Sequence, residues 1–366
     1  MFSPLALTQA LPFLPLAQGD IDYQTDLRGE EGLIGTVLAD PAAKVILTRD
    51  GRIAVPKGQA NIVDYENVSM RLATLPGSYV SAELASHPQA VAMYLGRYSG
   101  ERGERVVAVD ITRIADTPAP AEVTVPDSAS TGADDAFDEH DNGAGNGGAP
   151  KPSLLEQAVT RFDWVDLRGF APHASAREAG QATSAIPLSI WHNRQRFCPT
   201  CGAPVTAALA GGAQRCTNEA DGRRLLFPRI EPAVITAIVD SEDRLLLQHN
   251  SAWRDARLYS VSAGFVEAGE NLEHAARREA KEETGITLGE VKYLGSQPWP
   301  FPASLMMAFK AHALTTDITV DGAETMTARW VTRDEYTAEL VAGRMVAPGK
   351  ATIARYMIEE WYGREL

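Results

Sequence analysis

The stretch GFVEAGENLEHAARREAKEETGI, residues 264–286, decides how the C-terminal part of the chain folds. Residues 271–284 have the composition of a strong helix, and Gly285 supplies its stop. Three carboxylates stand at i, i+3 and i+4 on one face of this helix, those of Glu279, Glu282 and Glu283. Like charges so close repel each other. The arrangement is therefore favoured if hard cations lie between the acids. Mg²⁺ and Mn²⁺ are such cations, since both prefer oxygen ligands.

The neighbours of these acids fit the same interpretation. Arg278 adjoins the acidic face and is placed to orient one carboxylate through a bidentate contact. Gly264 and Gly269 allow the preceding loop to fold close against the start of the helix. Taken alone, the carboxylates also fit a solvated helix of mixed charge. The full spacing decides between the two.

That spacing is G-x5-E-x7-R-E-x2-E-E-x-G followed by an aliphatic residue, and every position is filled from Gly264 to Ile286. It resembles the signature of the Nudix hydrolases. The resemblance implies a C-terminal α/β/α sandwich in which this box forms a loop, a helix and a loop. The alternating apolar runs that follow residue 233 agree with an α/β (α+β) fold class.

The resemblance also assigns roles to individual residues. It implies a Mg²⁺ or Mn²⁺ site whose main ligands are Glu279 and Glu283, with Glu282 the third and the backbone carbonyl of Ala263 joining the shell. Arg278 belongs to the same catalytic group. Glu324, in the segment DGAETMTARWV, stands where relatives contribute a further acid. Its role stays open between metal ligand and general base.

A second motif, SQPWPFPAS at residues 296–304, narrows the substrate. Its three prolines predict a rigid, non-helical loop that presents Trp299 and Phe301 at set angles. Such a platform suits a stacked purine or nicotinamide ring, and Gln297 and Ser304 suit hydrogen bonds to ribose or amide groups. A proline-rich loop with buried aromatic side chains is the alternative from composition alone.

This motif closely resembles the marker of the NADH pyrophosphatase subfamily, as do WHNRQRFCPTCG (191–202) and FPRIEPAVI (227–235). Members split NADH or NAD⁺ into nicotinamide mononucleotide and AMP, and some remove an NAD cap from RNA 5′ ends. The subfamily is typically homodimeric, with sites near the subunit boundary. The resemblance implies substrate contacts at six positions: Phe227, Phe265, Gln297, Trp299, Ser304 and Ala354.

Three other functions remain as alternatives. A Nudix pyrophosphatase for ADP-ribose or another nucleoside diphosphate derivative would share the box but not the proline-rich motif. A non-catalytic nucleotide sensor generally loses box acids, whereas Glu270, Glu279, Glu282 and Glu283 are all present. An RNA-binding zinc module with an accessory hydrolase disagrees with the charge of the chain, so direct RNA affinity should be weak and salt-dependent.

The three cysteines of the chain, Cys198, Cys201 and Cys216, resemble the CxxC…CxxC zinc ribbon of the subfamily. Their odd number and clustering favour a metal site or free thiols over a disulfide framework. The fourth cysteine is missing, and Glu219 stands in its place. Glu219 or Asp221 is expected to complete a structural Zn²⁺ site, since carboxylates ligate zinc. The alternative is a ribbon that has lost its metal and holds by packing.

Composition sets the remaining expectations. Net charge is −14, which argues against a general duplex-DNA or anionic-membrane binder. No apolar stretch approaches the ~20 residues of a membrane span, and the N-terminus lacks the early basic residues of a secretory signal, so we expect a cytoplasmic protein. Residues 117–152, rich in Gly, Pro and Asp, predict a flexible acidic insertion.

These features give three units. Residues 1–193 are expected to form an α+β N-terminal domain, with a hairpin at Asp50-Gly51, strands over 90–98 and 105–114, and a mainly helical segment after the insertion. Residues 194–230 are the small zinc-ribbon-like module. Residues 231–366 are the Nudix domain, with strands on either side of a turn at residues 240–243 and a strand and loop over 257–270.

Overall fold

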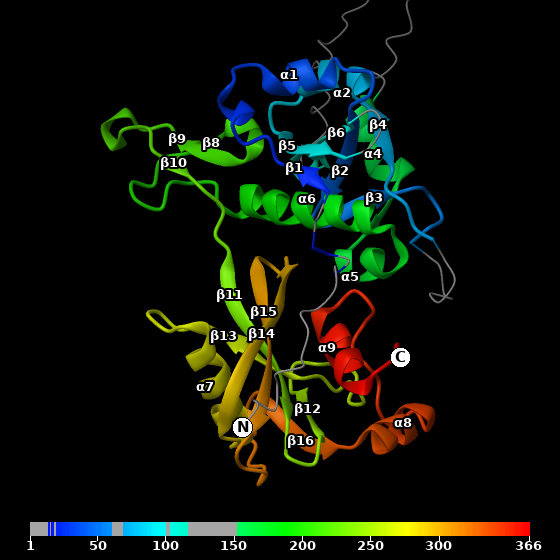
Figure 1. Cartoon of the computed structure of the whole chain (residues 1–366). Coiled ribbons are helices and arrows are strands. Elements are labelled where there is room, and N and C mark those ends of the chain that lie inside the picture. The colour runs from blue at the N-terminus through cyan, green and yellow to red at the C-terminus, as the bar shows by residue number, and fades with distance from the viewer. Residues whose placement is uncertain (1–13, 15, 18–19, 61–68, 100–102, 116–151) are drawn as a thin grey trace, which may run out of the picture.

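The computed structural model describes the chain except for residues 1–13, 15, 18–19, 61–68, 100–102 and 116–151. Three β-sheets organise the described residues (Figure 1). One belongs to the N-terminal half, a small one follows it, and the third carries the C-terminal third. The expected α/β class is confirmed. The predicted acidic insertion lies outside the described residues except for Pro152.

The N-terminal sheet has seven strands and mixed direction, because β2 and β6 run parallel and the other pairs are antiparallel. Asp50 and Gly51, at φ 50° and 70°, form the two-residue turn of the predicted hairpin. The strands, in spatial order, are β1 (Ile21–Asp22), β5 (Val91–Tyr98), β6 (Arg105–Asp110), β2 (Lys44–Arg49), β3 (Arg52–Val55) and β7 (Asp163–Val165), with β4 (Thr74–Pro76) paired to β2.

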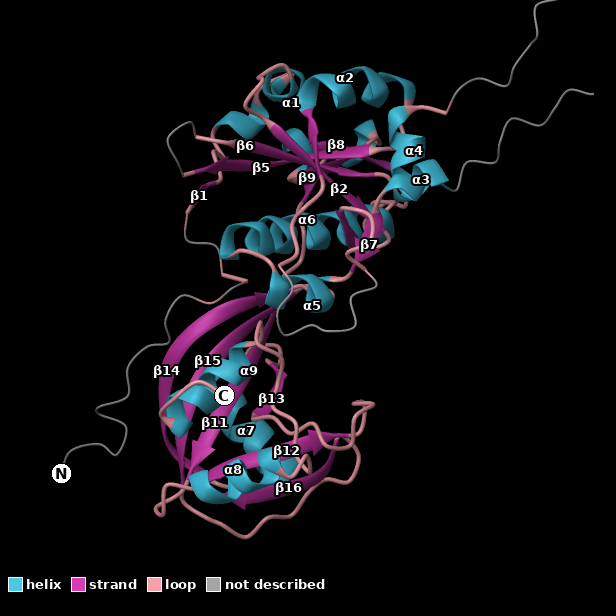
Figure 2. Ribbon diagram, turned by 90° about the vertical axis from the view of Figure 1, so that its right-hand side faces the viewer, coloured by secondary structure: helices cyan, strands magenta, loops and turns pink. Residues whose placement is uncertain are grey.

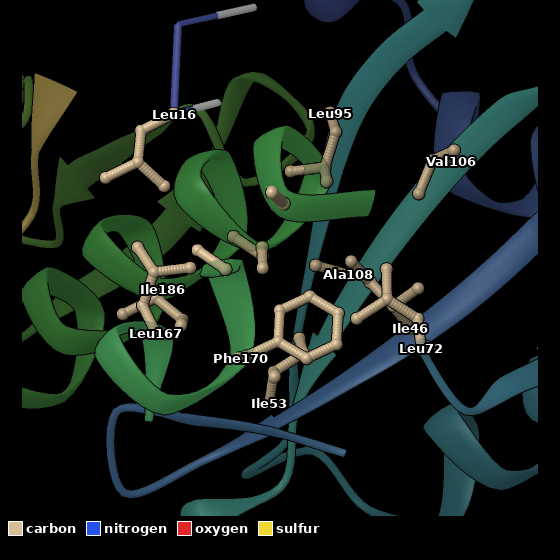
Figure 3. Close-up of a cluster of buried hydrophobic side chains, with 14 of the residues drawn as sticks. Leu16, Ile46, Ile53, Leu72, Leu95, Val106, Ala108, Leu167, Phe170 and Ile186 are labelled. Atoms are coloured by element: carbon tan, nitrogen blue, oxygen red, sulfur yellow. The ribbon is translucent and has the colours of Figure 1, made fainter. Parts of the chain in front are cut away.

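Helices cover both faces of this sheet because its strands are apolar on both sides. In β2, Val45 and Leu47 pack toward α1 (Leu33–Leu38), α2 (Gly77–Ser86) and α4 (Leu154–Arg161), whereas Ile46 packs toward α5 (Leu167–Phe170) and α6 (Ala176–Arg194). Figure 3 shows this second core, where Phe170 lies beside Ile46 and Ile53, and Ile186 lies next to Leu167. The short helix α3 (Thr112–Ala115) follows β6.

The small sheet is antiparallel, and three short 3-10 helices lie beside it or in its loops. Its strands are β8 (Val205–Ala208), β9 (Ala213–Cys216) and β10 (Leu225–Leu226), and the 3-10 helices are η1 (Leu27–Gly29), η3 (Leu209–Gly211) and η4 (Glu219–Asp221). Gly211 docks this sheet on β5. A Cβ at Gly211 would collide with the backbone of Ala92 and Met93, so only glycine permits the approach.

The C-terminal sheet lies between helix α7 (Leu272–Thr284) on one face and α8 (Arg333–Val341) and α9 (Ile353–Tyr362) on the other, an α/β/α sandwich (Figure 2). Ala275, Ala276 and Ala280 of α7 are fully buried, which keeps that helix close to the sheet. The strands, in spatial order, are β14 (Leu288–Trp299), β15 (Ser304–Ala313), β11 (Glu231–Val239), β12 (Leu245–Asn250) and β16 (Thr325–Val331), with β13 (Ser262–Phe265) paired to β11.

Three local predictions hold in kind and differ from the structure in detail. The mainly helical segment after the insertion also contains strand β7, because Trp164 and its neighbours complete the N-terminal sheet. The motif at 296–304, predicted as a rigid, non-helical loop, is a strand end, a tight turn at residues 300–303 and a strand start. Pro298 is tolerated in β14 because β14 is an edge strand. The strand predicted from residue 257 begins at Ser262.

No helix among the described residues is long and apolar enough to cross a membrane.

Candidate active site

Helix α7 is built as its sequence predicts. Its N-cap is Asn271, whose side chain accepts a hydrogen bond from the backbone N–H of His274 at 2.8 Å. At the other end, Gly285 adopts φ 76° and donates its N–H to the carbonyl of Lys281. Both termini are therefore fixed, which fixes the direction of the glutamates between them.

Arg278 is the centre of the charged network on this helix. Its Nε and Nη2 donate to the two oxygens of Glu270 at 2.9 and 2.8 Å, so the predicted bidentate contact is made with an acid of the preceding loop and not with one of the helix face. Nη1 donates to Glu279 and Glu282, and Nη2 donates also to the carbonyl of Phe265. Arg278 lowers the pKa of Glu270 to about 2. The loop before the helix is thereby locked to the helix itself.

Glu279 and Glu283 are the enclosed members of the acidic group. The Glu279 side chain lies over Gly264, where any Cβ would clash with its carboxylate, so Gly264 is required for this approach. Glu283 is 3% exposed, and its Oε2 accepts from Gln248 Nε2 at 2.9 Å and Ser262 Oγ at 2.7 Å. Its other oxygen, Oε1, receives no hydrogen bond from the described residues, which leaves it available to a ligand.

These acids line a cavity of about 560 Å³. Burial, together with repulsion from Glu279 and Glu324, raises the pKa of Glu283 to about 7. Burial also raises the pKa of Glu279. Carboxyl groups that lie side by side resist ionisation because their negative charges repel each other. Bound cations would relieve this repulsion, so the arrangement fits a metal site. The acids of the cavity are Glu267, Glu279, Glu282, Glu283, Asp321 and Glu324.

A second pocket of about 660 Å³ adjoins this cavity, and the two share the walls formed by Ala263, Trp299, Phe301 and Met306. The rings of Trp299 and Phe301 meet edge to face, with their centroids 4.7 Å apart. The pocket contains no Asp or Glu in its lining and is mostly apolar. The motif at 296–304 therefore sets an aromatic wall between an acidic compartment and an apolar one.

The structure does not place Gln297 as the sequence suggested. Its side chain is fully buried rather than directed at a ligand. Nε2 donates to the carbonyl of Ala351 at 3.0 Å, and Oε1 accepts from the N–H of Ile353 at 2.8 Å. Because Gln297 belongs to an edge strand that packs on α9, its amide is used to fix the start of that helix.

The remaining predicted contact residues surround the two compartments. Ala354 on α9 lines the apolar pocket, and Ser304 at the start of β15 lines the acidic cavity. Phe265 lies at the mouth of the cavity and is 57% exposed. Phe227 is 58% exposed and lines neither compartment. Of the six contact residues predicted from the sequence, all but Phe227 and Gln297 therefore line one cleft.

Comparison with known proteins identifies the family to which this arrangement of residues belongs. A family model described as the NUDIX domain matches residues 229–355. The NAD-capped RNA hydrolase NudC of Mycobacterium bovis (strain BCG / Pasteur 1173P2) is 36% identical over 290 residues, which cover 76% of this chain and 78% of that protein. The chain belongs to the Nudix hydrolase family.

Two further relatives of this Nudix hydrolase match a smaller share of the chain. Nudix hydrolase 19, chloroplastic, of Arabidopsis thaliana is 42% identical over 187 residues, 50% of this chain and 41% of that protein. The NAD-capped RNA hydrolase NUDT12 of Homo sapiens is 36% identical over 194 residues, 50% of this chain and 42% of that protein. Both matches span about half of the present chain.

The Nudix chain also carries a compact thiol cluster. Ligand atoms of Cys198, Cys201, Cys216 and Asp221 all lie within 4.8 Å of one another. The sulfurs of Cys201 and Cys216 are 3.5 Å apart, close to the ~3.8 Å edge of a tetrahedron with zinc–sulfur bonds of about 2.3 Å. All three cysteines are free. The donor set and its spacing fit one tetrahedral metal ion.

The fourth member of the cluster is Asp221, one of the two carboxylates that the sequence left open, and not Glu219, which stands in the place of the missing cysteine. The turn η4 begins at Glu219 and carries the chain back, so that Asp221 Oδ2 approaches Cys198 Sγ at 3.4 Å. The carboxylate of Glu219 is not part of the cluster. Arg224 holds the pKa of Asp221 below its usual range, which keeps the carboxylate ionised as a ligand requires.

Asp321 and Arg168 are among the cleft residues that sequence reasoning missed. Asp321 lines the acidic cavity and accepts backbone N–H groups of Ala323, Glu324 and Thr325, which aims the Glu324 segment. The Asp-Gly pair at 321–322 is a turn signal that would have revealed it. Arg168 reaches the aromatic wall from the N-terminal half, and no local pattern in the sequence indicates this contact.

Proposed function

We propose that this Nudix hydrolase cleaves the diphosphate of NADH or NAD⁺ to nicotinamide mononucleotide and AMP, and removes the NAD cap from RNA 5′ ends. The NAD-capped RNA hydrolases of mycobacteria and of Homo sapiens, to which the chain is similar, support the cap reaction. Retention of the acidic box argues for an active enzyme over a nucleotide sensor.

The observation that carries the proposal is the joined cleft. An acidic compartment suited to metal-bound phosphates shares a wall with an apolar compartment suited to a nucleoside ring. A dinucleotide has this same sequence of parts, a flat ring, a ribose and a diphosphate. Trp299 and Phe301 stand at the point where ring and phosphate would meet.

Nudix hydrolases use divalent metal ions, and the acidic cavity fits them because hard cations prefer its carboxylate oxygens. We assign Glu279, Glu283, Glu282 and the carbonyl of Ala263 as the residues that would hold Mg²⁺ or Mn²⁺. When bound, the ions would polarise a phosphoryl oxygen and stabilise the charge that develops on the diphosphate.

The residues of the chain perform the other tasks. Arg278 holds Glu270, Glu279 and Glu282 in fixed positions, so the cavity is preorganised. A water oxygen forms a new bond to one phosphorus, the P–O bond to the bridging oxygen breaks, and that oxygen leaves with the other nucleotide. Glu324 lies exposed at the cavity with no ion-pair partner among the described residues. It serves as a further ligand or accepts the proton of the water.

The ring of one nucleoside half would occupy the apolar pocket against Trp299 and Ala354, with Ser304 beside the phosphates. The protein is proposed to act as a homodimer, since Phe227 and Phe265 each expose more than half of their surface. A second subunit that covers them would complete an aromatic clamp. Light scattering of Phe227→Asp beside the wild type tests this, and a wild-type monomer contradicts it.

The thiol cluster would hold a structural Zn²⁺ that supports residues 194–230 between an N-terminal domain (1–193) and the Nudix domain (231–366). A closed set of four protein ligands is typical of structural rather than catalytic zinc. The metal would therefore take no part in hydrolysis.

The deciding experiment is product chromatography after incubation with NADH, ADP-ribose or NAD-capped RNA in Mg²⁺ or Mn²⁺. Reduced nicotinamide mononucleotide and AMP from NADH, at a higher kcat/KM than for ADP-ribose, support the proposal. Preference for ADP-ribose overturns the NAD assignment but keeps the Nudix chemistry. Failure to hydrolyse any of the three, with tight binding of one, supports a sensor.

A further inference from the structure

A groove outside the catalytic cleft concentrates positive charge on an acidic protein. It has a volume of about 760 Å³ and lies between α6, the segment that leads to the cysteines, and the turn from β14 to β15. Figure 1 shows α6 directly above the ends of these strands. Four arginines line the groove, and Glu231 is its one acid: Arg28, Arg194, Arg196 and Arg229.

None of these four guanidinium groups forms an ion pair with a carboxylate of the described residues. In contrast, Arg244, Arg278 and Arg355 elsewhere are each bound by carboxylates. The Nε of Arg28 is buried without any hydrogen-bond partner in the described structure. Such unneutralised cations on a chain of net charge −14 point to an anionic ligand.

The groove also presents flat side chains to solvent. Phe197 is 60% exposed and Tyr23 is 46% exposed, and Trp191 lines the same wall. Arginines beside exposed aromatic rings form the surface that binds single-stranded nucleic acid. The cations contact phosphates and the rings stack on bases without regard to sequence.

The groove and the catalytic cleft meet at a single residue among the described ones. Ser304 lines both the groove and the acidic cavity, at the start of β15. Pro300, Pro302 and Ala303 of the neighbouring turn form the groove floor. An RNA chain that follows a cap held in the cavity would reach the groove by passing Ser304.

We propose that this groove binds the first nucleotides of single-stranded RNA that follow the adenosine of an NAD cap. The proposal rests on the proposed function. The phosphates would lie against Arg194, Arg196 and Arg229, and the bases against Phe197 and Tyr23. Free NADH has no such extension, so the groove contributes to turnover of capped RNA and not of the dinucleotide.

The test uses the full-length double variant Arg196→Gln/Arg229→Gln. Its control is Arg52→Gln/Arg161→Gln, which removes the same charge from two exposed arginines that do not line the groove. For capped RNA, kcat/KM should fall about tenfold in the groove variant. The slope of log kcat/KM against the logarithm of salt concentration should become shallower by about 0.7 for each phosphate that the variant no longer binds. For NADH, kcat/KM should stay within about twofold, and the control should behave as the wild type.

An equal loss on NADH and capped RNA, or no loss on capped RNA, overturns the proposal. If the variant turns from dimer to monomer in light scattering and loses both activities, the groove is an interface between copies of the chain. Fluorescence anisotropy with a labelled, uncapped 5′-monophosphate oligonucleotide separates this proposal from the proposed function. Weak, salt-sensitive binding that the groove variant loses supports the groove even if NADH proves not to be a substrate.

Discussion

The guanidinium carbon of Arg168 lies 3.7 Å from the centroid of the Phe301 ring and 5.6 Å from that of Trp299. Arg168 belongs to α5 of the N-terminal half, and the two rings form the wall between the acidic cavity and the apolar pocket. The N-terminal half therefore contributes directly to the shape of the cleft. Both rings also pack against the apolar cluster to which Leu167 and Phe170 belong.

Replacement of Arg168 tests this relationship. A cation over an aromatic ring stabilises by about 0.5–1 kcal/mol at exposed sites. We expect Arg168→Ala to lower kcat/KM for NADH by about two- to fivefold, mainly through KM, and Arg168→Lys to retain more activity. Steady-state kinetics with both variants checks this. An unchanged KM in the alanine variant would show that the rings keep their places without the arginine.

Glu283→Gln should abolish turnover and leave the fold intact. The substitution keeps the size of a buried side chain but removes a charge that the proposed metal site needs. Loss of metal-assisted stabilisation of several kcal/mol corresponds to at least about a hundredfold in kcat. Circular dichroism checks the fold. Glu273→Gln, an exposed acid of the same helix, is the matched control. Near-wild-type activity in Glu283→Gln would remove this residue from the metal site.

The raised pKa of Glu283 predicts how pH affects metal binding. Its folded pKa of about 7 lies above the ordinary value of 4.5. In the metal-free protein this group therefore contributes stability that is present below pH 4.5 and is lost as pH rises through 7. A metal ion binds only the ionised form and competes with the proton. The rise in Tm on addition of Mn²⁺ should thus be larger at pH 8 than at pH 5.5.

The control for this pH effect is Glu283→Gln, whose side chain does not titrate. Differential scanning fluorimetry of both proteins, with and without Mn²⁺, gives the comparison. The variant should show a smaller metal-induced shift and a weaker dependence on pH. If the wild type gains the same Tm at both pH values, proton competition at Glu283 plays no part.

Trp299→Ala should weaken dinucleotide binding much more than metal binding. The ring lines both compartments but carries no metal-binding atom. Loss of one stacking platform costs about 1–3 kcal/mol, a five- to 150-fold rise in the Kd for NADH. Isothermal titration of Mn²⁺ and of NADH, the latter with inactive Glu283→Gln as background, measures the two separately. Equal damage to both affinities would mean that Trp299 is structural.

Local patterns predicted the chemistry of the cleft better than its shape. Helix α7, its cap and the acidic face follow from spacing within 23 residues, because helical periodicity is a local property. The hairpin at Asp50-Gly51 is likewise set by two residues that accept positive φ. In both cases the residues that determine the local structure are close together in the sequence.

Interactions between distant segments were not predictable from one sequence. Gln297 has the character of a ligand residue, but its amide is used by Ala351 and Ile353, more than fifty positions away. Arg168 gives no local signal and becomes part of the cleft only because α5 packs beside the strand end at Trp299. The groove arginines are likewise separated by up to 201 positions between Arg28 and Arg229 and gather only in three dimensions.

The choice between Asp221 and Glu219 gives the sharpest test of the thiol cluster. Both acids stand in η4, but the carboxylate of Asp221 lies with the three sulfurs and that of Glu219 does not. Purified Asp221→Ala should lose most of its bound zinc, measured by mass spectrometry of the metal content, and should unfold at a lower temperature because a closed structural site contributes directly to folding. Glu219→Ala should retain zinc and Tm. Zinc loss in Glu219→Ala but not in Asp221→Ala would reverse the assignment, and absence of zinc from the wild type would show that the module is held by packing.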